Sequence, residues 1–180
     1  MIRLFVGLEL PEELRLRVAA LCGGVPGARW VKPESMHLTV RFIGEVDEGR
    51  FDDIAMALSR IKAPAFELTL TGISTFGKAH APHTLWIGVR RNEALGTLHA
   101  KVDRALVTAG LEPESRKYSP HVTLARLKEA SGLRLGGFVT ANSLFSAGPA
   151  PIGQFVLFSS FLSKSGAIYK PEVHYPLSGG

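Results

Sequence analysis

A four-residue pattern occurs twice in this chain of 180 residues, and it constrains the fold more than any other feature. The two copies are His37–Val40, read HLTV, and His121–Leu124, read HVTL. In both copies a polar residue alternates with an apolar one, as expected of a β-strand with one face against a core. The sequence therefore predicts two strands that each present an imidazole and a hydroxyl on the same face.

Two imidazoles that face each other can supply acid–base chemistry near neutral pH. An ordinary histidine pKa of about 6.5 allows one ring to be neutral while the other is protonated. The neutral ring can take a proton from attacking water and the protonated ring can give one to a leaving alkoxide, as phosphodiester hydrolysis requires. Hydroxyls of Thr39 and Thr123 can donate to the non-bridging oxygens. We therefore expect His37 and His121 to be catalytic, with no cofactor and no metal ion.

Two arginines near the motifs are candidates for binding phosphate. Arg41 follows His37 by four residues, so strand alternation predicts that it shares the face of His37 and Thr39. Arg126 follows His121 by five residues and is out of phase, so it points away from Thr123 unless a β-bulge redirects it. A guanidinium offers a planar pair of donors to phosphate. We expect both arginines to bind phosphate, with the stronger argument for Arg41.

Each of these residues also has a purely structural interpretation. A single strand histidine is usually packed or at the surface, threonine favours strands, and exposed arginine is common. The recurrence of the whole pattern is what favours catalysis. We assign no role to the other histidines, and we expect Trp30 and Trp86 to be packing residues. Those other histidines are His80, His83, His99 and His174.

Local patterns along the chain predict an α+β fold. Strands are expected at 3–10, 37–43, 66–76, 84–89, 121–127, 154–162 and 168–175, and Gly44 is expected to close the second of them. Helices are expected from Pro11 to Gly23, from Asp47 to about Lys62, and over 93–109. The segment 130–151 is rich in Gly, Ser and Pro and gives no clear pattern. No tandem repeat of fixed period is present.

Composition limits the environment and the partner. The chain carries 21 Lys and Arg against 16 Asp and Glu, a net charge of +5, which favours an anionic partner without forming a basic tail. Cys22 is the only cysteine, so no intramolecular disulfide can form. No apolar run reaches the roughly 18 residues that a membrane span needs. We expect a soluble cytoplasmic protein.

Several segments beyond the two motifs resemble one known family. They are the opening Arg3–Val6, the stretch Trp30–Val46, the pair Leu85-Trp86, and Pro120–Arg126. Together with the motifs they resemble the 2H phosphoesterase superfamily, named for two His-x-Thr-x motifs, and most closely the RNA 2′,3′-cyclic phosphodiesterases also called 2′-5′ RNA ligases. Tyr118 departs from the phenylalanine that is more usual before the second motif, and it keeps an aromatic ring.

The resemblance implies a fold and a reaction. It implies one bilobal domain over residues 1–180, in which two antiparallel sheets with pseudo-twofold symmetry flank a central cleft and helices lie outside. It implies that His37 donates a proton, that His121 accepts one, and that the product is a 2′-phosphomonoester. Weak, reversible 2′-5′ ligation is implied as well. The expected partner is RNA with a 2′,3′-cyclic phosphate end, with tRNA fragments as one candidate, and the expected state is a monomer.

Three alternatives stay open at the level of sequence. Another 2H enzyme, acting on 2′-5′ oligoadenylate or ADP-ribose cyclic phosphate, would share both motifs and differ in loops such as 77–83 and 130–151. A non-catalytic module could hold an RNA end in the same cleft, although Lys or Arg would serve simple phosphate binding equally well. A metal-dependent hydrolase would lose its activity in EDTA. Two roles stay open for Phe42: its ring can stack on a base, or it can face the core.

Overall fold

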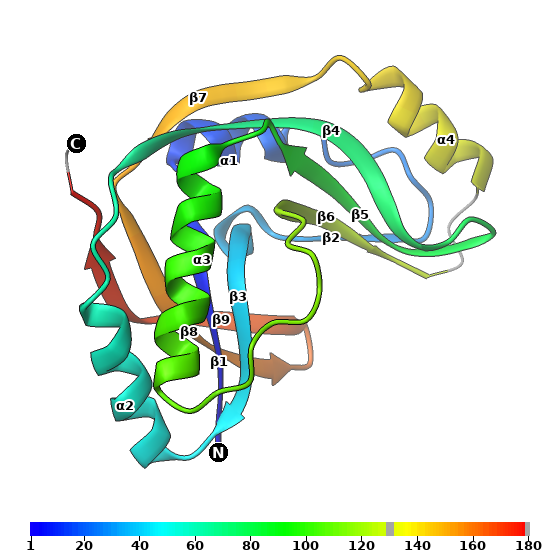
Figure 1. Ribbon diagram of the computed structural model, residues 1–180. Coiled ribbons are helices and arrows are strands. Elements are labelled where there is room, and N and C mark those ends of the chain that lie inside the picture. Colours follow the sequence, from blue (N-terminus) through cyan, green and yellow to red (C-terminus); the bar gives the residue numbers. More distant parts are fainter. Residues whose placement is uncertain (129–131, 179–180) are drawn as a thin grey trace.

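The computed structural model describes residues 1–128 and 132–178, and it is dominated by β-strands (Figure 1). The strands are β1 Ile2–Glu9, β2 Ala28–Trp30, β3 His37–Val46, β4 Phe66–Lys78, β5 Ala81–Val89, β6 His121–Leu127, β7 Ser146–Ile152, β8 Gln154–Ser163 and β9 Gly166–Pro176. The helices are α1 Glu12–Ala19, α2 Glu48–Ser59, α3 Glu93–Thr108 and α4 Gly132–Ala141, with a 3₁₀ turn at Pro33–Ser35.

The strands form two antiparallel groups of four. One group runs in the order β3-β1-β8-β9 and the other in the order β7-β4-β5-β6, with β2 added to β6. Among residues 1–128 and 132–178, strand pairing joins the two groups at a single residue pair, Leu38 of β3 with Val122 of β6. The two strands that carry the repeated motif therefore meet at the centre of the molecule. This is the α+β, two-lobed arrangement that was predicted, although the two expected sheets are joined at β3 and β6 into one nine-stranded sheet.

Helices cover the outer faces of both lobes, and the main apolar core extends through both lobes. Helices α2 and α3 pack on each other, with α3 against β3 and α2 against β9, while α1 lies on β7. Their starts follow the sequence signals, because the side chains of Asp47 and Asn92 accept from the backbone N–H three residues on. The fully buried set includes Leu38 and Val122, so the apolar residues of both motifs point into the core.

Strand β3 differs from its predicted end. It continues through Gly44 to Val46, and Gly44 has a φ of 96° at a register shift, where Leu4 pairs with Gly44 but Phe5 pairs with Phe42. A glycine with positive φ suits a bulge inside a strand, so the residue that was expected to close the strand instead bends it.

The Gly-, Ser- and Pro-rich segment contains regular structure that its composition concealed. Residues 132–141 form α4 and residues 146–152 form β7, which pairs with β4 at the edge of the second lobe. Residues 130 and 131 lie outside the described part of the chain. Among the described residues no helix is long and apolar enough to span a membrane.

Candidate active site

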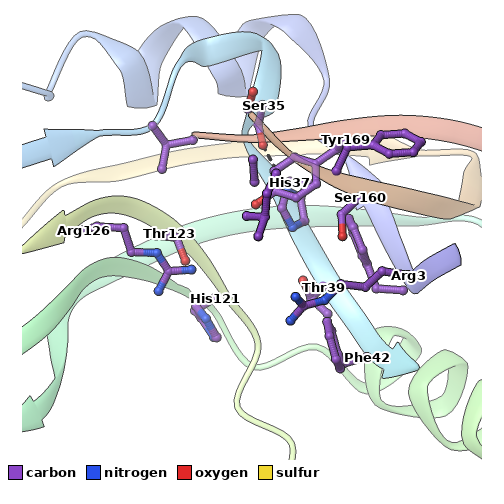
Figure 2. Close-up of a pocket in the computed structure, with 15 residues that line it drawn as sticks. Arg3, Ser35, His37, Thr39, Phe42, His121, Thr123, Arg126, Ser160 and Tyr169 are labelled. Atoms are coloured by element: carbon purple, nitrogen blue, oxygen red, sulfur yellow. Dashed lines mark hydrogen bonds between the residues drawn. The ribbon is translucent and has the colours of Figure 1, made fainter. Parts of the chain in front are cut away.

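A cavity of about 350 Å³ opens between the two lobes, and both motifs contribute to its wall. His37 and Thr39 enter from β3, and His121 and Thr123 enter from β6, so the structure brings together all four residues of the repeated pattern (Figure 2). The other residues that line the cavity are Arg3, Phe5, Val31, Ser35, Phe42, Arg126, Ser160, Phe161, Leu162, Ala167 and Tyr169.

The two imidazoles are held in the same way. Nδ1 of His37 lies 2.9 Å from the carbonyl oxygen of Ser35, and Nδ1 of His121 lies 2.7 Å from that of Ser119. A carbonyl oxygen can only accept, so each Nδ1 carries the hydrogen and donates it. In the neutral ring Nε2 then holds the free lone pair, and in the protonated ring Nε2–H is the free donor. Each histidine can therefore take or give a proton at Nε2.

Aromatic rings surround His37. Its ring centroid lies 4.8 Å from that of Phe5 and 4.6 Å from that of Tyr169, and Phe158 stacks on Phe5 from behind. Burial lowers the pKa of His37 from its ordinary 6.5, and the charges of His121 and Arg126 act in the same direction, whereas the bond to Ser35 opposes them. The neutral form of His37 is therefore favoured in the free protein.

His121 rests on a second aromatic pair. Phe76 of β4 meets it edge-on at 4.8 Å, and Trp86 of β5 lies at 5.8 Å. Trp86 pairs with Thr123 across β5 and β6, which puts its ring on the cleft side of the sheet beneath the motif. Trp86 is thus a packing residue, as expected, and the residue that it supports is a candidate catalytic histidine. Trp30 packs on Phe138 instead.

A bulge turns Arg126 into the cavity. Leu85 pairs with Ala125 but Trp86 pairs with Thr123, so Leu124 is an extra residue in β6. The extra residue reverses the alternation, and Arg126 joins the face of His121 and Thr123 (Figure 2). Its Nη1 donates to the hydroxyl of Thr84 at 3.0 Å.

Arg41 does not reach the cavity, and the orientation expected from simple alternation is wrong. In β3 the extra residue is Val40, because Val6 pairs with Arg41 but Gly7 pairs with Thr39. Arg41 therefore turns to the helix side, where it is 9% exposed and its Nε donates to Asp103 of α3 at 2.8 Å. Its other nitrogens donate to the carbonyls of Phe42 and Glu112.

The environment of Arg41 links the loop before the second motif to the first motif strand. Asp103 also accepts from the backbone N–H of Glu114, and the hydroxyl of Tyr118 donates to the carbonyl of Thr39 at 2.9 Å. His99 stacks on Tyr118 with 4.0 Å between the ring centroids. Arg41 is therefore part of the structure that holds the loop leading to His121, and it is not a cavity residue.

Phe42 occupies the position in β3 that Arg126 has in β6. The bulge at Val40 brings it to the cavity, where its side chain is 46% exposed and the guanidinium of Arg3 lies 5.2 Å from its ring centroid. Phe161 and Leu162 of β8 are also exposed there. One end of the cavity is therefore aromatic, with the guanidinium of Arg3 over Phe42, whereas the other end carries the charge of Arg126 (Figure 2).

Sequence reasoning missed the residues that support the site. Ser35 and Ser119 both stand two residues before a motif histidine, so the repeat extends to Ser-x-His-x-Thr, a signal that was available. The serines act through backbone carbonyls, however, and this role is not specific to serine. Nothing in the sequence indicated that Thr84 and Tyr169 belong to the site.

Two of the histidines that were given no role have partners outside the repeated motifs. His83 contacts Thr84 at 2.8 Å, and His174 pairs with Glu9. Within the described residues no three His, Cys, Asp or Glu side chains gather as metal ligands do.

The chain was compared with known proteins. The family model "LigT like Phosphoesterase" matches it twice, over residues 8–86 and 87–169. A protein of Aeropyrum pernix, named RNA 2′,3′-cyclic phosphodiesterase, is 34% identical over 87% of this chain and 89% of its own length. A protein of Archaeoglobus fulgidus with the same name is 30% identical over 93% of this chain and 96% of its own.

Solved structures have the same fold. Escherichia coli LigT complexed with 3′-AMP superposes with a TM-score of 0.77, at 25% identity, over 98% of both chains. Each match to the family model contains one His-x-Thr-x motif and the bulge that follows it, whereas each lobe draws its strands from both halves of the chain. The chain belongs to the LigT-like phosphoesterase family of the 2H superfamily.

Proposed function

We propose that this protein hydrolyses the 2′,3′-cyclic phosphate at the end of an RNA chain and leaves a 2′-phosphomonoester. The observation that carries the proposal is the presence of His37 and His121 in one cavity, each with Nδ1 bound to a carbonyl and Nε2 free. The names of the Aeropyrum and Archaeoglobus relatives support the substrate. The E. coli protein forms a complex with 3′-AMP, which supports a nucleotide as the kind of ligand.

In the proposed reaction the two histidines divide the proton transfers. Nε2 of His121 takes a proton from water as the water oxygen attacks phosphorus, and Nε2–H of His37 gives its proton to the 3′ oxygen as the bond from phosphorus to that oxygen breaks. This assignment follows the family resemblance. With the 5′-hydroxyl of a second RNA in place of water, the same steps form a 2′-5′ phosphodiester.

The lowered pKa of His37 places a condition on its role as proton donor. In the free protein the neutral ring is favoured, because it is buried and lies near the charges of His121 and Arg126. A phosphate that enters the cavity brings a negative charge, which stabilises the imidazolium and raises the pKa of His37. The donor form therefore develops when the substrate binds.

Three side chains are placed to hold the phosphate. The hydroxyls of Thr39 and Thr123 can donate to the non-bridging oxygens, and Arg126 brings a positive charge from the same face of β6. Arg41 has no part in this proposal, because its donors are used by Asp103, Phe42 and Glu112. At the other end of the cavity Phe42 offers an exposed ring on which a base can stack.

The test is hydrolysis of a nucleoside 2′,3′-cyclic phosphate in EDTA, with the product isomer identified by ³¹P NMR. We expect wild type to release the 2′-phosphate, and His37→Ala and His121→Ala each to lose about 10²- to 10⁴-fold in kcat. His174→Ala is the matched control, because His174 is exposed, pairs with Glu9 and lies outside the cavity. Full turnover by His121→Ala would refute the mechanism, and loss of activity in EDTA would point to a metal-dependent hydrolase.

A further inference from the structure

A row of paired residues crosses the second lobe at the edge of the cavity. Thr84 of β5 pairs with Arg126 of β6, and Arg126 pairs in turn with Arg29 of β2. Residues directly opposite each other in antiparallel strands have their side chains on the same face of the sheet. Arg29 therefore lies on the cleft face, and Arg126 lies between Arg29 and Thr84.

The neighbours of Arg29 agree with this orientation. Ala28 and Trp30 pair with the buried residues Leu127 and Ala125, so they face the core. Val31, which is two residues beyond Arg29, lines the cavity. Arg29 is exposed and does not itself line the cavity, so its charge lies beside the part of the wall that Val31 and Arg126 form.

Two arginines directly opposite each other in a sheet destabilise it by charge repulsion. In the described part of the chain neither Arg29 nor Arg126 forms an ion pair, and Arg126 instead donates to the neutral hydroxyl of Thr84. The other end of the cavity carries a single arginine, Arg3, whose guanidinium lies over the ring of Phe42 and whose strand partner Glu45 has the opposite charge. Of the two ends, the one with Arg29 and Arg126 is therefore better suited to an anion.

We propose that Arg29, together with Arg126, binds the first phosphodiester on the 5′ side of the terminal nucleotide. This inference rests on the proposed function, in which the cyclic phosphate lies between the two histidines. The base of that nucleotide then takes the aromatic end at Phe42, and the ribose directs its 5′ oxygen toward the basic end. The site accordingly favours oligonucleotide ends over mononucleotides, because only an oligonucleotide has this phosphodiester.

The experiment compares two substrates that have the same terminal nucleoside. One is adenosine 2′,3′-cyclic phosphate, which has no 5′ phosphodiester, and the other is a short oligoadenylate that ends in the same cyclic phosphate. For Arg29→Ala we expect kcat/KM on the oligonucleotide to fall about tenfold, as for one exposed charge-assisted hydrogen bond. On the mononucleotide it should not change.

Salt dependence gives a second measurement. Loss of one contact to a single-stranded phosphate should reduce the slope of log kcat/KM against log salt by about 0.7 on the oligonucleotide. Arg29→Lys should keep most of that slope, because it keeps the charge. Arg104→Ala is the matched control: it removes one exposed arginine from α3, outside the cavity, and should change neither substrate.

Two results would overturn the inference. If Arg29→Ala leaves the oligonucleotide unaffected, no phosphodiester binds there. If it slows both substrates equally, Arg29 acts on the reaction centre and not on the RNA chain. Should wild type hydrolyse neither substrate, the proposed function fails, and the subsite is then decided by fluorescence anisotropy with an oligoadenylate that ends in a 2′-phosphate. In that assay, weaker binding of the oligoadenylate by Arg29→Ala than by Arg104→Ala supports the proposed phosphodiester site. Equal binding by the two variants refutes it.

Discussion

Replacement of Thr84 by valine should weaken the proposed binding of phosphate by Arg126 and leave His37 and His121 in place. Thr84 is 2% exposed, and its hydroxyl accepts from Nη1 of Arg126 at 3.0 Å and contacts Nδ1 of His83 at 2.8 Å. Valine has nearly the same shape but no hydroxyl. Arg126 would then lose the neighbour that fixes its direction, while its charge and its strand position stay the same.

The size of the effect follows from the burial of the two partners. A hydrogen bond to a charged group contributes about 1.5 to 3 kcal/mol. Arg126 is exposed, so water can replace the hydroxyl in part, and we take ~1 kcal/mol as the loss. This corresponds to about a fivefold lower kcat/KM, since ~1.4 kcal/mol is tenfold.

The assay is a double-mutant cycle with adenosine 2′,3′-cyclic phosphate as substrate. We measure kcat/KM for wild type, Thr84→Val, Arg126→Ala and the double variant, with Thr84→Ser as the variant that restores the hydroxyl and thermal unfolding as the check on folding. Thr84→Val should cost about fivefold when Arg126 is present and nothing when it is absent. An equal cost in both backgrounds, or a failure of serine to restore activity, would show that Thr84 contributes only to packing.

Three further predictions concern the folded state. Folding lowers the pKa of His37, so around the ordinary histidine pKa of 6.5 the unfolded chain binds more protons than the folded chain. The free energy of unfolding should therefore fall as the pH drops from 7.5 to 5.5. Urea titrations should show a smaller fall for His37→Gln. Asp103→Ala leaves the buried Arg41 without its carboxylate and should cost about 2 kcal/mol, or ~4 to 8 °C in Tm, whereas the exposed Asp53→Ala should change Tm little. If the two lobes form one domain, calorimetry of the 180-residue chain should give one transition of ~125 kcal/mol with equal calorimetric and van't Hoff enthalpies, and two separate transitions would contradict this.

Alternation and capping predicted most of the fold because they are local signals. The strands around His37 and His121 and the helix that begins after Asp47 lie close to where the sequence placed them. Helix α4 and strand β7 were not predicted, since six of the residues over 132–152 are glycine or proline and neither residue favours a helix or strand interior. Contacts with the rest of the molecule supply what local preference lacks, as in the pairing of β7 with β4.

The same limit explains which site residues were predicted correctly in position. His37, Thr39, His121 and Thr123 lie before the bulges, where a period of two holds, and all four line the cavity. Arg41 and Arg126 lie after the bulges, where one extra residue reverses the faces. A bulge depends on the pairing with a neighbouring strand, which is far away in the sequence.

The two bulges also explain how equivalent lobes can form a cleft with two different ends. Each bulge falls on the third residue after a motif histidine, at Val40 and at Leu124, and each brings the fifth residue after that histidine into the cavity. In the first lobe this residue is Phe42, and in the second it is Arg126. The backbone symmetry therefore positions the two imidazoles alike, whereas this one residue in each lobe differs, an aromatic ring in the first and a guanidinium in the second. Exchange of these two residues should consequently leave the bulges in place and move the charge of Arg126 to the end that already carries Arg3. The cleft would then no longer fit a nucleotide held in the proposed direction, and kcat/KM on adenosine 2′,3′-cyclic phosphate should fall.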